Sequence, residues 1–437
     1  MRLSVESMVY GADGLAHDAD GKAVFVQGAV TGDVVEAECV SSGKSFSRAR
    51  TVEVLEPSPL RVQPPCPLVD VCGGCPWGNL SRAAQLEAKQ ANVEDTLERV
   101  GRFPREEVKA LVEPIRSTGD DWGYRNKVEL ASYRDRGKLR FGMHGRDPER
   151  MVPVKSCPLF EKRHGRVLAS VSGALGYLVN SRDLSLERVG IRASARTGNV
   201  QVALWTPTGG FPRAQVKRVL EDACKTTGVV RVMSKGDKRA RRVSSTEVLG
   251  GVGRWAERIA GGRMFLSAPS FFQVNTPAAE ILVDLVMQAL DPKEDELAVD
   301  LYCGAGTFTL PLARRAGFVC AVESYGPAVR DLTHNVNKAN LANVEPIGGD
   351  AAREFPDEDV DVLVVDPPRA GLDEKVVELV SSTSARDVAY VSCDPATLAR
   401  DLRRFCDRGV FKPVSVTPVD LFPQTYHVET VTHLTRA

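Results

Sequence analysis

Short apolar segments alternate with helical patterns after Pro277, and this alternation constrains the fold more than any other feature of the chain. Four of these segments read ELAVDLYCG, FVCAVES, VDVLVVDPP and DVAYVSCDP. Such runs, separated by helices, predict a parallel sheet covered by helices on both faces. Ligands of these sheets bind where the carboxyl ends of the strands meet. Functional residues are therefore expected directly after each apolar segment.

The chain before this region predicts two further domains of an α/β protein. Residues 1–56 alternate apolar and polar positions in runs such as KAVFVQGAV and GDVVEAECV, which is typical of a small OB-like β-barrel. Residues 57–265 mix a helical run over 81–100 with the strand-like segments KVELASY and KLRFGMH, which predicts an α+β domain. Residues 266–437 form the third, Rossmann-like domain.

Composition narrows the classes of protein. The 57 basic and 57 acidic residues balance, so a nucleic-acid site must be a local patch. No segment has the length and apolar character of a membrane span, and the N-terminus lacks a signal-peptide pattern. We expect a cytoplasmic monomer whose ten cysteines stay reduced.

Acidic residues follow or end four successive apolar segments. They are Asp300, Glu323, Asp350 and Asp366. Gly304 and Gly306 allow a tight turn and the close approach of a ligand, and an acidic residue about 20 positions later is placed to accept hydrogen bonds from a ribose. A dinucleotide favours a third glycine where Thr309 stands. S-adenosylmethionine (SAM) has no phosphate and needs no third glycine, so the pattern favours SAM.

Cys393, at the end of the fifth predicted strand, DVAYVSCDP, and Glu429 carry a second pattern. A buried cysteine and an exposed strand glutamate are the ordinary alternatives. A strand-end cysteine beside a polar turn is better placed to be a thiolate. Methylation of uracil carbon 5 needs one cysteine and one base, because thiolate addition at carbon 6 creates the enolate that takes the methyl group. Methylation of an exocyclic amine needs no cysteine and typically has an aromatic residue where this chain has Arg369.

The segments APSFFQVN, DLYCGAGTFTLPLA, VVDPPRAG, SCDPATLARD and LFPQTYHVE, in this order, resemble the RNA 5-methyluridine (uracil-5) methyltransferase family. The resemblance implies a class I SAM methyltransferase domain with Cys393 as nucleophile and Glu429 as base. It also implies six cofactor-binding residues, Gln273, Tyr302, Thr307, Glu323, Asp350 and Asp366. Many members carry Asn at the place of Thr307, although a hydroxyl can still bond to the cofactor. The run VYGADGLAHDADGKAVFVQGAV resembles the TRAM domain, an RNA-binding barrel.

Four cysteines have the spacing of a metal site: Cys66, Cys72, Cys75 and Cys157. Four thiolates satisfy tetrahedral zinc or an iron–sulfur cluster, and spacing does not decide between them. The family resemblance implies a [4Fe-4S] cluster. A radical SAM enzyme can also carry a TRAM domain, but its C-x3-C-x2-C run leaves one iron open. The remaining five cysteines are interpreted as core residues: Cys39, Cys224, Cys303, Cys320 and Cys406.

Three basic segments are candidate RNA contacts: 124–127, 133–144 and 234–242. Cations would contact phosphates, and the aromatic residues of the first two segments would stack on an unpaired base. The target uridine must leave its stack, so a loop or bulge is the expected substrate. The resemblance favours the 23S ribosomal RNA branch of the family over transfer RNA, because the cysteine cluster accompanies mainly ribosomal RNA enzymes. Two alternatives stay open: a tRNA uracil-5 methyltransferase, and an RNA-binding protein that keeps the fold without turnover. A folate- and flavin-dependent enzyme would need a dinucleotide fingerprint near the N-terminus, which the chain lacks.

Overall fold

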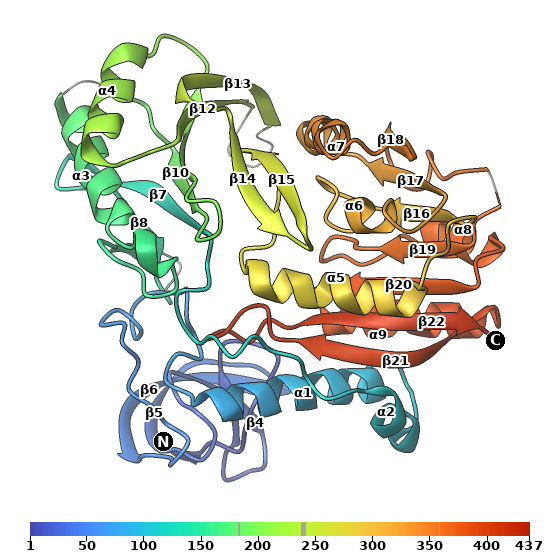
Figure 1. Cartoon of the computed structure of the whole chain (residues 1–437). Helices are drawn as coiled ribbons and strands as arrows, with labels where there is room; N and C mark the ends of the chain where they lie inside the picture. The colour runs from blue at the N-terminus through green and yellow to red at the C-terminus, as the bar shows by residue number, and fades with distance from the viewer. Residues whose placement is uncertain (148, 182–183, 237–241, 358) are drawn as a thin grey trace.

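The computed structural model describes residues 1–437 except 148, 182–183, 237–241 and 358. Its strands form a six-stranded sheet, two seven-stranded sheets and a two-stranded hairpin (Figure 1). The predicted α/β class is confirmed by this arrangement, in which helices and sheets alternate through the last third of the chain.

The N-terminal sheet has the strand order β1-β5-β6-β4-β3-β2. Its strands are β1 (Arg2–Ser4), β2 (Ser7–Met8), β3 (Gly14–His17), β4 (Ala23–Gln27), β5 (Val34–Ser42) and β6 (Phe46–Glu56). Alternate side chains of β4 point inward and pack with small apolar residues of the other strands, which agrees with the alternation in the sequence. Cys39 is an exception to the expected core cysteines, because it is exposed on the half of β5 that extends beyond this core.

Two helices then lead to an extended segment: α1 (Arg82–Arg99) and α2 (Arg105–Leu111). They pack against helix α9 and strand β21 of the last sheet. The extended segment pairs with β21, where Glu113 N donates to the Val416 carbonyl at 2.9 Å and Arg116 N donates to the Pro418 carbonyl at 2.8 Å. The chain thus contributes to the edge of the last sheet long before that sheet begins in the sequence.

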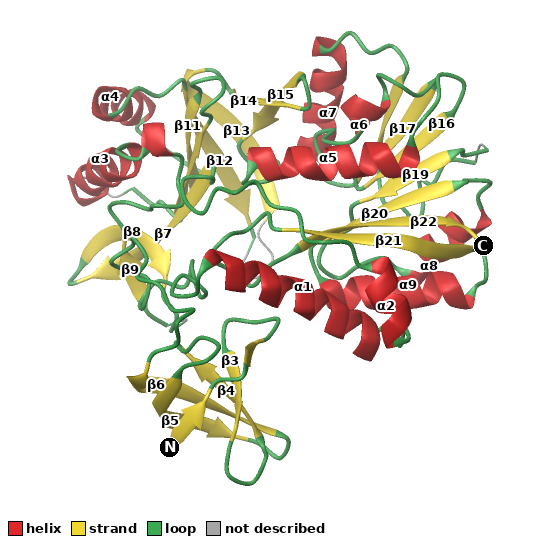
Figure 2. Cartoon of the chain, turned by 60° about the horizontal axis from the view of Figure 1, so that its bottom comes forward, coloured by secondary structure: helices red, strands yellow, loops and turns green. Residues whose placement is uncertain are grey.

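The middle sheet has the order β13-β12-β11-β10-β7-β8-β9, with helices α3 and α4 side by side next to it (Figure 2). Its elements are β7 (Lys127–Asp135), β8 (Lys138–His144), β9 (Met151–Pro153), η1 (Lys162–His164), α3 (Val167–Ser181), β10 (Arg188–Ala193), β11 (Val200–Pro207), α4 (Arg213–Ala223), β12 (Gly228–Lys235) and β13 (Arg242–Gly251). The hairpin of β14 (Arg254–Ile259) and β15 (Gly262–Ser267) follows and packs on helix α7.

The last sheet has the order β18-β17-β16-β19-β20-β22-β21. Its elements are α5 (Thr276–Leu290), β16 (Leu297–Leu301), α6 (Thr309–Leu312), β17 (Phe318–Glu323), α7 (Gly326–Lys338), β18 (Val344–Gly348), β19 (Val362–Val365), α8 (Glu374–Ser382), β20 (Asp387–Ser392), α9 (Pro395–Asp407), β21 (Phe411–Val419) and β22 (Glu429–Arg436). Strands β16 to β20 pair in parallel, and β22 inserts antiparallel between β20 and β21. Helices α5, α6 and α7 cover one face, and α1, α8 and α9 cover the other (Figure 2). Both faces are therefore buried, which explains why these strands are continuous apolar runs.

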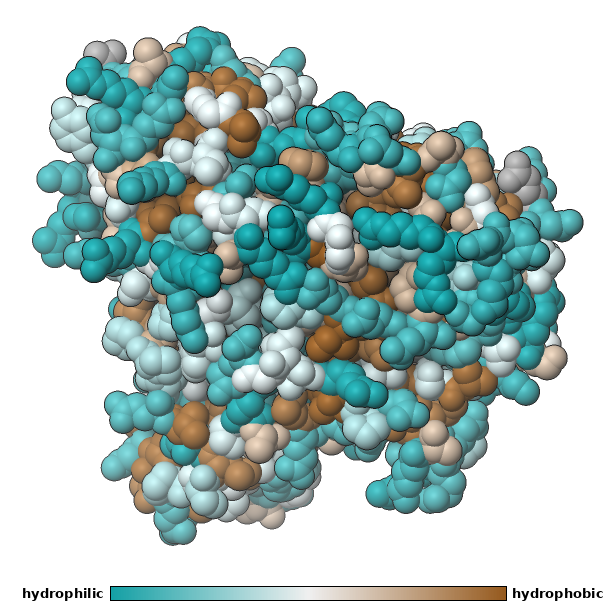
Figure 3. All heavy atoms as spheres, viewed as in Figure 1, coloured by the Kyte–Doolittle hydropathy of each residue, from teal (hydrophilic) through white to brown (hydrophobic). Residues whose placement is uncertain are grey.

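In the described part of the chain no helix combines the length and apolar character needed to cross a membrane. Hydrophilic side chains cover most of the face seen in Figure 3, and apolar ones form small separate groups.

Candidate active site

The turn after β16 leaves open space beside its backbone. Tyr302, Gly304 and Gly306 have positive φ angles of 63°, 58° and 100°, and no atom lies within 4 Å of the place where a side chain on Gly304 would begin. A tyrosine in the left-handed region is strained, and such strain collects at ligand sites. Asp300, the last residue but one of β16, is fully buried. One of its oxygens accepts a 2.5 Å hydrogen bond from Thr309 Oγ1, and the other, Oδ1, has no partner among the described residues.

The neighbouring strand supplies a carboxylate that orders this turn. Glu323 ends β17, and its Oε2 accepts from Gly304 N at 3.0 Å while its Oε1 accepts from Tyr325 N at 2.6 Å. Asp350, after β18, is exposed and holds its own turn through a 3.0 Å hydrogen bond from Ala352 N. Burial and the charge of Asp350 raise the pKa of Tyr302 to about 12. The first three strand-end carboxylates therefore share one edge, as the sequence predicted.

Asp366 adds another acceptor to this edge, and Gln273, in the segment before α5, is a further buried acceptor. Asp366 directly follows β19, and its backbone N donates to the Leu301 carbonyl of the adjacent strand at 3.3 Å. Desolvation, helped by the charge of Glu323, raises the pKa of Asp366 to about 7, and desolvation raises that of Asp300 to about 8. Gln273 is buried with its Oε1 unpartnered among the described residues. Thr307 lies half-buried beside Gly306.

These acceptors fit SAM. The ligand carries ribose hydroxyls, an ammonium group and a sulfonium, all of which are donors or cations. The edge offers an unpaired buried oxygen on Asp300, two carboxyls whose neutral form is favoured in the absence of a cation, and a turn with room beside Gly304. Gln273 offers a second unpaired buried oxygen. Burying an acceptor without a partner is costly, so each unpaired oxygen indicates a missing donor.

Strand pairing places Cys393 beside Glu429. Ser392, the last residue of β20, pairs with Thr430 of β22, and Thr430 Oγ1 donates to the Ser392 carbonyl at 3.3 Å. Cys393 follows Ser392 and is half-buried, while Glu429 begins β22 and is 2% exposed. Glu429 Oε2 has no partner among the described residues.

The two side chains also influence one another electrostatically. Burial, and then the charge of Glu429, raise the pKa of the Cys393 thiol to about 12. Burial, and then the charge of Asp366, raise the pKa of Glu429 well above its ordinary value. Burial therefore favours the protonated form of both groups. The candidate nucleophile, the candidate base and the strand-end carboxyls lie along one edge of the sheet.

Arg369 and His427 complete this edge and were not in the predicted site. The positive charge of exposed Arg369 lowers the pKa of both Cys393 and Glu429, against the effect of burial. Its Nη2 lies 3.4 Å from His427 Nε2, and burial and Arg369 lower the pKa of His427 to about 4. His427 is therefore neutral. The place of Arg369, directly after the Asp366-Pro-Pro turn, was the signal available in the sequence.

Comparison with known proteins assigns the chain to a family. A model described as tRNA (Uracil-5-)-methyltransferase matches residues 258–357 and 354–437. An uncharacterized RNA methyltransferase of Gloeobacter violaceus is 35% identical over 100% of this chain and 96% of its own length. Another, from Halalkalibacterium halodurans, is 32% identical over 99% of this chain and 96% of its own. The chain belongs to the RNA (uracil-5-)-methyltransferase family.

A solved structure agrees with this assignment. The crystal structure of Pyrococcus abyssi tRNA (uracil-54, C5)-methyltransferase, in complex with S-adenosyl-L-homocysteine, is 25% identical in sequence. It covers 99% of each chain with a TM-score of 0.76. The protein is thus a SAM-dependent RNA (uracil-5-)-methyltransferase, and methylation of uracil carbon 5 in RNA is the activity of its family.

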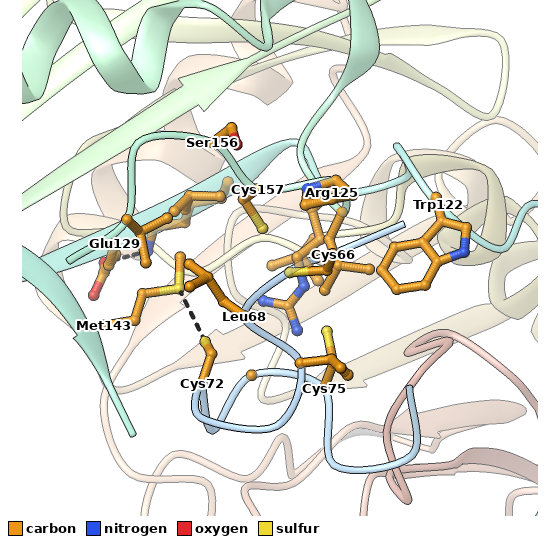
Figure 4. Close-up of a pocket in the computed structure, with 18 residues that line it drawn as sticks. Cys66, Leu68, Cys72, Cys75, Trp122, Arg125, Glu129, Met143, Ser156 and Cys157 are labelled. Atoms are coloured by element: carbon orange, nitrogen blue, oxygen red, sulfur yellow. Dashed lines mark hydrogen bonds and ion pairs between the residues drawn. The ribbon is translucent and has the colours of Figure 1, made fainter. Parts of the chain in front are cut away.

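The four cysteines of this methyltransferase line one cavity of about 340 Å³ (Figure 4). The sulfurs of Cys66, Cys75 and Cys157 point into a shared space that Arg125 also enters, whereas Cys72 Sγ lies 4.0 Å from Met143 Sδ. Burial raises the pKa of Cys75 to about 12, with the charge of Cys157 as the next cause. Among the described residues no group of three or more potential ligands is close enough to hold a single metal ion, so a preformed zinc tetrahedron is absent there.

The first candidate RNA segment of the methyltransferase is wrong in its main residues. Tyr124 is buried and its hydroxyl donates to the Pro423 carbonyl at 2.9 Å. Asn126 is also buried and donates to the Gln273 carbonyl at 2.9 Å. Their polar groups are used inside the protein, so they are unavailable to RNA. Segment 133–144 forms most of the β7 and β8 hairpin, and within 234–242 residues 237–241 lie outside the described residues.

Proposed function

We propose that this methyltransferase transfers a methyl group to carbon 5 of a uridine in a loop or bulge of ribosomal RNA through a covalent cysteine adduct. Cys393 adds to carbon 6, and Glu429 removes the proton from carbon 5. The observation that carries the proposal is the pairing of β20 with β22, which sets the half-buried thiol beside a buried, unpaired carboxyl. Burial of two ionisable groups next to each other raises the free energy of their charged forms, and such pairs cluster at catalytic sites.

The six predicted cofactor residues would hold SAM along the same edge: Gln273, Tyr302, Thr307, Glu323, Asp350 and Asp366. Asp300 was not among the predicted cofactor residues. It would join them because its Oδ1 is buried without a partner among the described residues. Bound SAM supplies an electrophilic methyl group and a positive charge. The buried carboxyls orient it and exclude water, and the open turn at Gly304 accommodates it.

Proton positions follow from the pKa shifts. The Cys393 thiol must lose its proton before it attacks, and Glu429 must be ionised when it receives the proton from carbon 5. Arg369 favours both ionised forms, because its charge lowers both pKa values. When Glu429 has taken the carbon 5 proton, the sulfur–carbon bond breaks and the cysteine leaves as a thiolate. The thiolate then takes back from solvent the proton that it lost to solvent before the attack, and Glu429 releases the carbon 5 proton to solvent. The enzyme is restored, and the uridine carries one methyl group in place of one proton.

We also propose three domains: residues 1–56 as a TRAM barrel that holds RNA, 57–265 around the cysteine cavity, and 266–437 as the methyltransferase domain. Four cysteines around one cavity favour a [4Fe-4S] cluster, since a cubane spreads its thiolate ligands further apart than a single ion does. Arg125, which lies among these sulfurs, would offset part of the negative charge of the cluster.

Transfer RNA is a second candidate substrate. It is favoured by the resemblance to the Pyrococcus enzyme over 99% of both chains. Ribosomal RNA is favoured by the four cysteines that line one cavity, as in the ribosomal RNA branch of the family.

The test is incubation of the purified enzyme with tritiated SAM and unmodified ribosomal or transfer RNA, followed by digestion to nucleosides. We expect label in 5-methyluridine from ribosomal RNA. Label in 5-methyluridine from transfer RNA alone would show that transfer RNA is the substrate and that methylation still occurs at carbon 5 of uridine. Label in another nucleoside would contradict the proposal. Binding of both RNAs without transfer would support the alternative of an RNA-binding protein without turnover.

A further inference from the structure

A tyrosine of the N-terminal region contacts Cys393 at the edge of the last sheet that also carries Asp300, Asp366 and Glu429, here called the catalytic edge. Tyr10 lies between β2 and β3, and its hydroxyl donates a 3.2 Å hydrogen bond to the backbone carbonyl of Cys393, 383 positions later. The residue is half-buried at this place and packs against the apolar core between the last sheet and its helices. A barrel that only tethers RNA has no need of such a contact.

The loop around Tyr10 is anchored on both sides of the site. The Tyr10 ring meets Tyr426 edge-on, with centroids 5.6 Å apart and an angle of 86°. The next carbonyl, that of Gly11, accepts from Trp77 Nε1 at 3.0 Å, and Trp77 N donates to the Gln424 carbonyl at 3.1 Å. Trp77 itself is fully buried. Tyr10 is therefore held against the loop that leads into Glu429 as well as against Cys393.

The chemistry of the contact suits a fixed donor. Burial raises the pKa of Tyr10 well above its ordinary value, so the phenol keeps its proton and the hydrogen bond persists across the working pH range. Ser392 Oγ and Asp394 order the same turn from within, because Ser392 Oγ donates to the Asp394 carbonyl at 3.1 Å and the Asp394 side chain caps α9. Tyr10 supplies the tie from outside the domain.

We propose that Tyr10 is a positioning residue for Cys393, so that the N-terminal barrel completes the catalytic turn as well as binding RNA. The inference rests on the proposed role of Cys393 as nucleophile. Tyr10 acts through the Cys393 backbone, and its loss changes the direction and accessibility of the thiol without removing any group that takes part in the reaction.

The test compares Tyr10→Phe, which keeps the ring and loses the hydroxyl, with Tyr177→Phe on the exposed side of α3 as a matched control. We expect Tyr10→Phe to lower kcat about fivefold, as loss of one hydrogen bond allows, with KM for RNA within about twofold of wild type. Thermal unfolding is measured for both variants, and the midpoint should be unchanged.

A second readout follows the thiol without RNA. Iodoacetamide labelling is quantified by peptide mass spectrometry, with exposed Cys39 as the internal reference. The rate at Cys393 relative to Cys39 should change at least about threefold in Tyr10→Phe and not in Tyr177→Phe. Wild-type kcat together with wild-type labelling would overturn the inference. Activity that survives Cys393→Ala would instead overturn the proposed function, so the two failures are distinguishable.

Discussion

The catalytic edge and the cysteine cavity are both places where burial opposes ionisation, but they are built differently. At the edge, Asp300, Asp366 and Glu429 lie in or next to strands whose register fixes them. In the cavity, Cys66, Cys72, Cys75 and Cys157 lie on turns between helices and strands. Strands hold acceptors in place before a ligand arrives, whereas turns that carry thiols depend on the group that joins them. The edge is therefore preorganised, and we expect the cavity to gain its order from the proposed cluster.

The largest expected effect on the rate of methyl transfer comes from removing the proposed nucleophile, Cys393. Cys393→Ala should lower methyl transfer by more than about 1000-fold, because no other group can add to carbon 6. Cys406→Ala, at the far end of α9, is the matched control and should keep activity within about twofold. Initial rates with tritiated SAM measure both variants. Equal activity of the two would remove the covalent step from the account.

A smaller effect concerns the unpaired oxygen of Asp300. Asp300→Asn should weaken SAM binding about 10- to 100-fold, the range for loss of a hydrogen bond with a charged group. Asp350→Asn is the comparison, and it should cost less because Asp350 is exposed. Isothermal titration calorimetry gives both affinities. A larger loss from Asp350→Asn would show that the cation is held elsewhere on the edge.

The pH dependence of binding sharpens the same point. At rest the raised pKa values keep Asp366 protonated below about 7 and Asp300 below about 8. A cation binds the ionised forms, so affinity for SAM should rise with pH between about 6 and 9, with protons released on binding. Calorimetry in buffers of different ionisation enthalpy counts those protons. Affinity that is flat or falls over this range would contradict the assignment.

Stability should move in the opposite direction with pH. In the folded protein the pKa values of Asp366 and Asp300 are raised above the unfolded value of about 4. The two protonated carboxyls therefore stabilise the folded state fully below about pH 4, and this stabilisation is lost as the pH rises through about 7 to 8. The denaturant midpoint of the SAM-free enzyme should therefore fall from pH 6 to pH 9. In Asp300→Asn part of this slope should disappear, and an unchanged slope would assign the loss to other groups.

The smallest expected effect on chemistry comes from the cavity. Cys75→Ala should remove the visible absorption of an iron–sulfur cluster and lower the melting temperature, because the turns lose the group that joins them. The rate of methyl transfer by the folded fraction should stay within about fivefold, since the cluster takes no part in the proposed reaction. Cys224→Ala is the control. A loss of transfer as large as that of Cys393→Ala would make the cavity part of the catalytic machinery.

The residues at the carboxyl edge of the last sheet could be predicted from the sequence, because parallel strands bring their carboxyl ends together. Asp366 and Cys393 follow apolar runs, so their placement on one edge needed only the alternation of strands and helices. The prediction that Tyr124 and Asn126 contact RNA was wrong, because polar residues in a basic segment are expected to be exposed. Here both are buried by packing and donate to carbonyls far away in the sequence, those of Pro423 and Gln273. The contact between Tyr10 and Cys393 depends on how the loop between β2 and β3 packs on the last sheet, and no local sequence pattern predicts that packing.

The most direct test of the covalent mechanism uses Glu429→Gln, which keeps the shape of the side chain but cannot take the carbon 5 proton. The variant is incubated with SAM and unmodified RNA, treated with nuclease and protease, and its peptides are mapped by mass spectrometry. The expected product is a methylated uridine nucleotide attached to the peptide that contains Cys393. Continued turnover without this adduct, or an adduct on another residue, would contradict it.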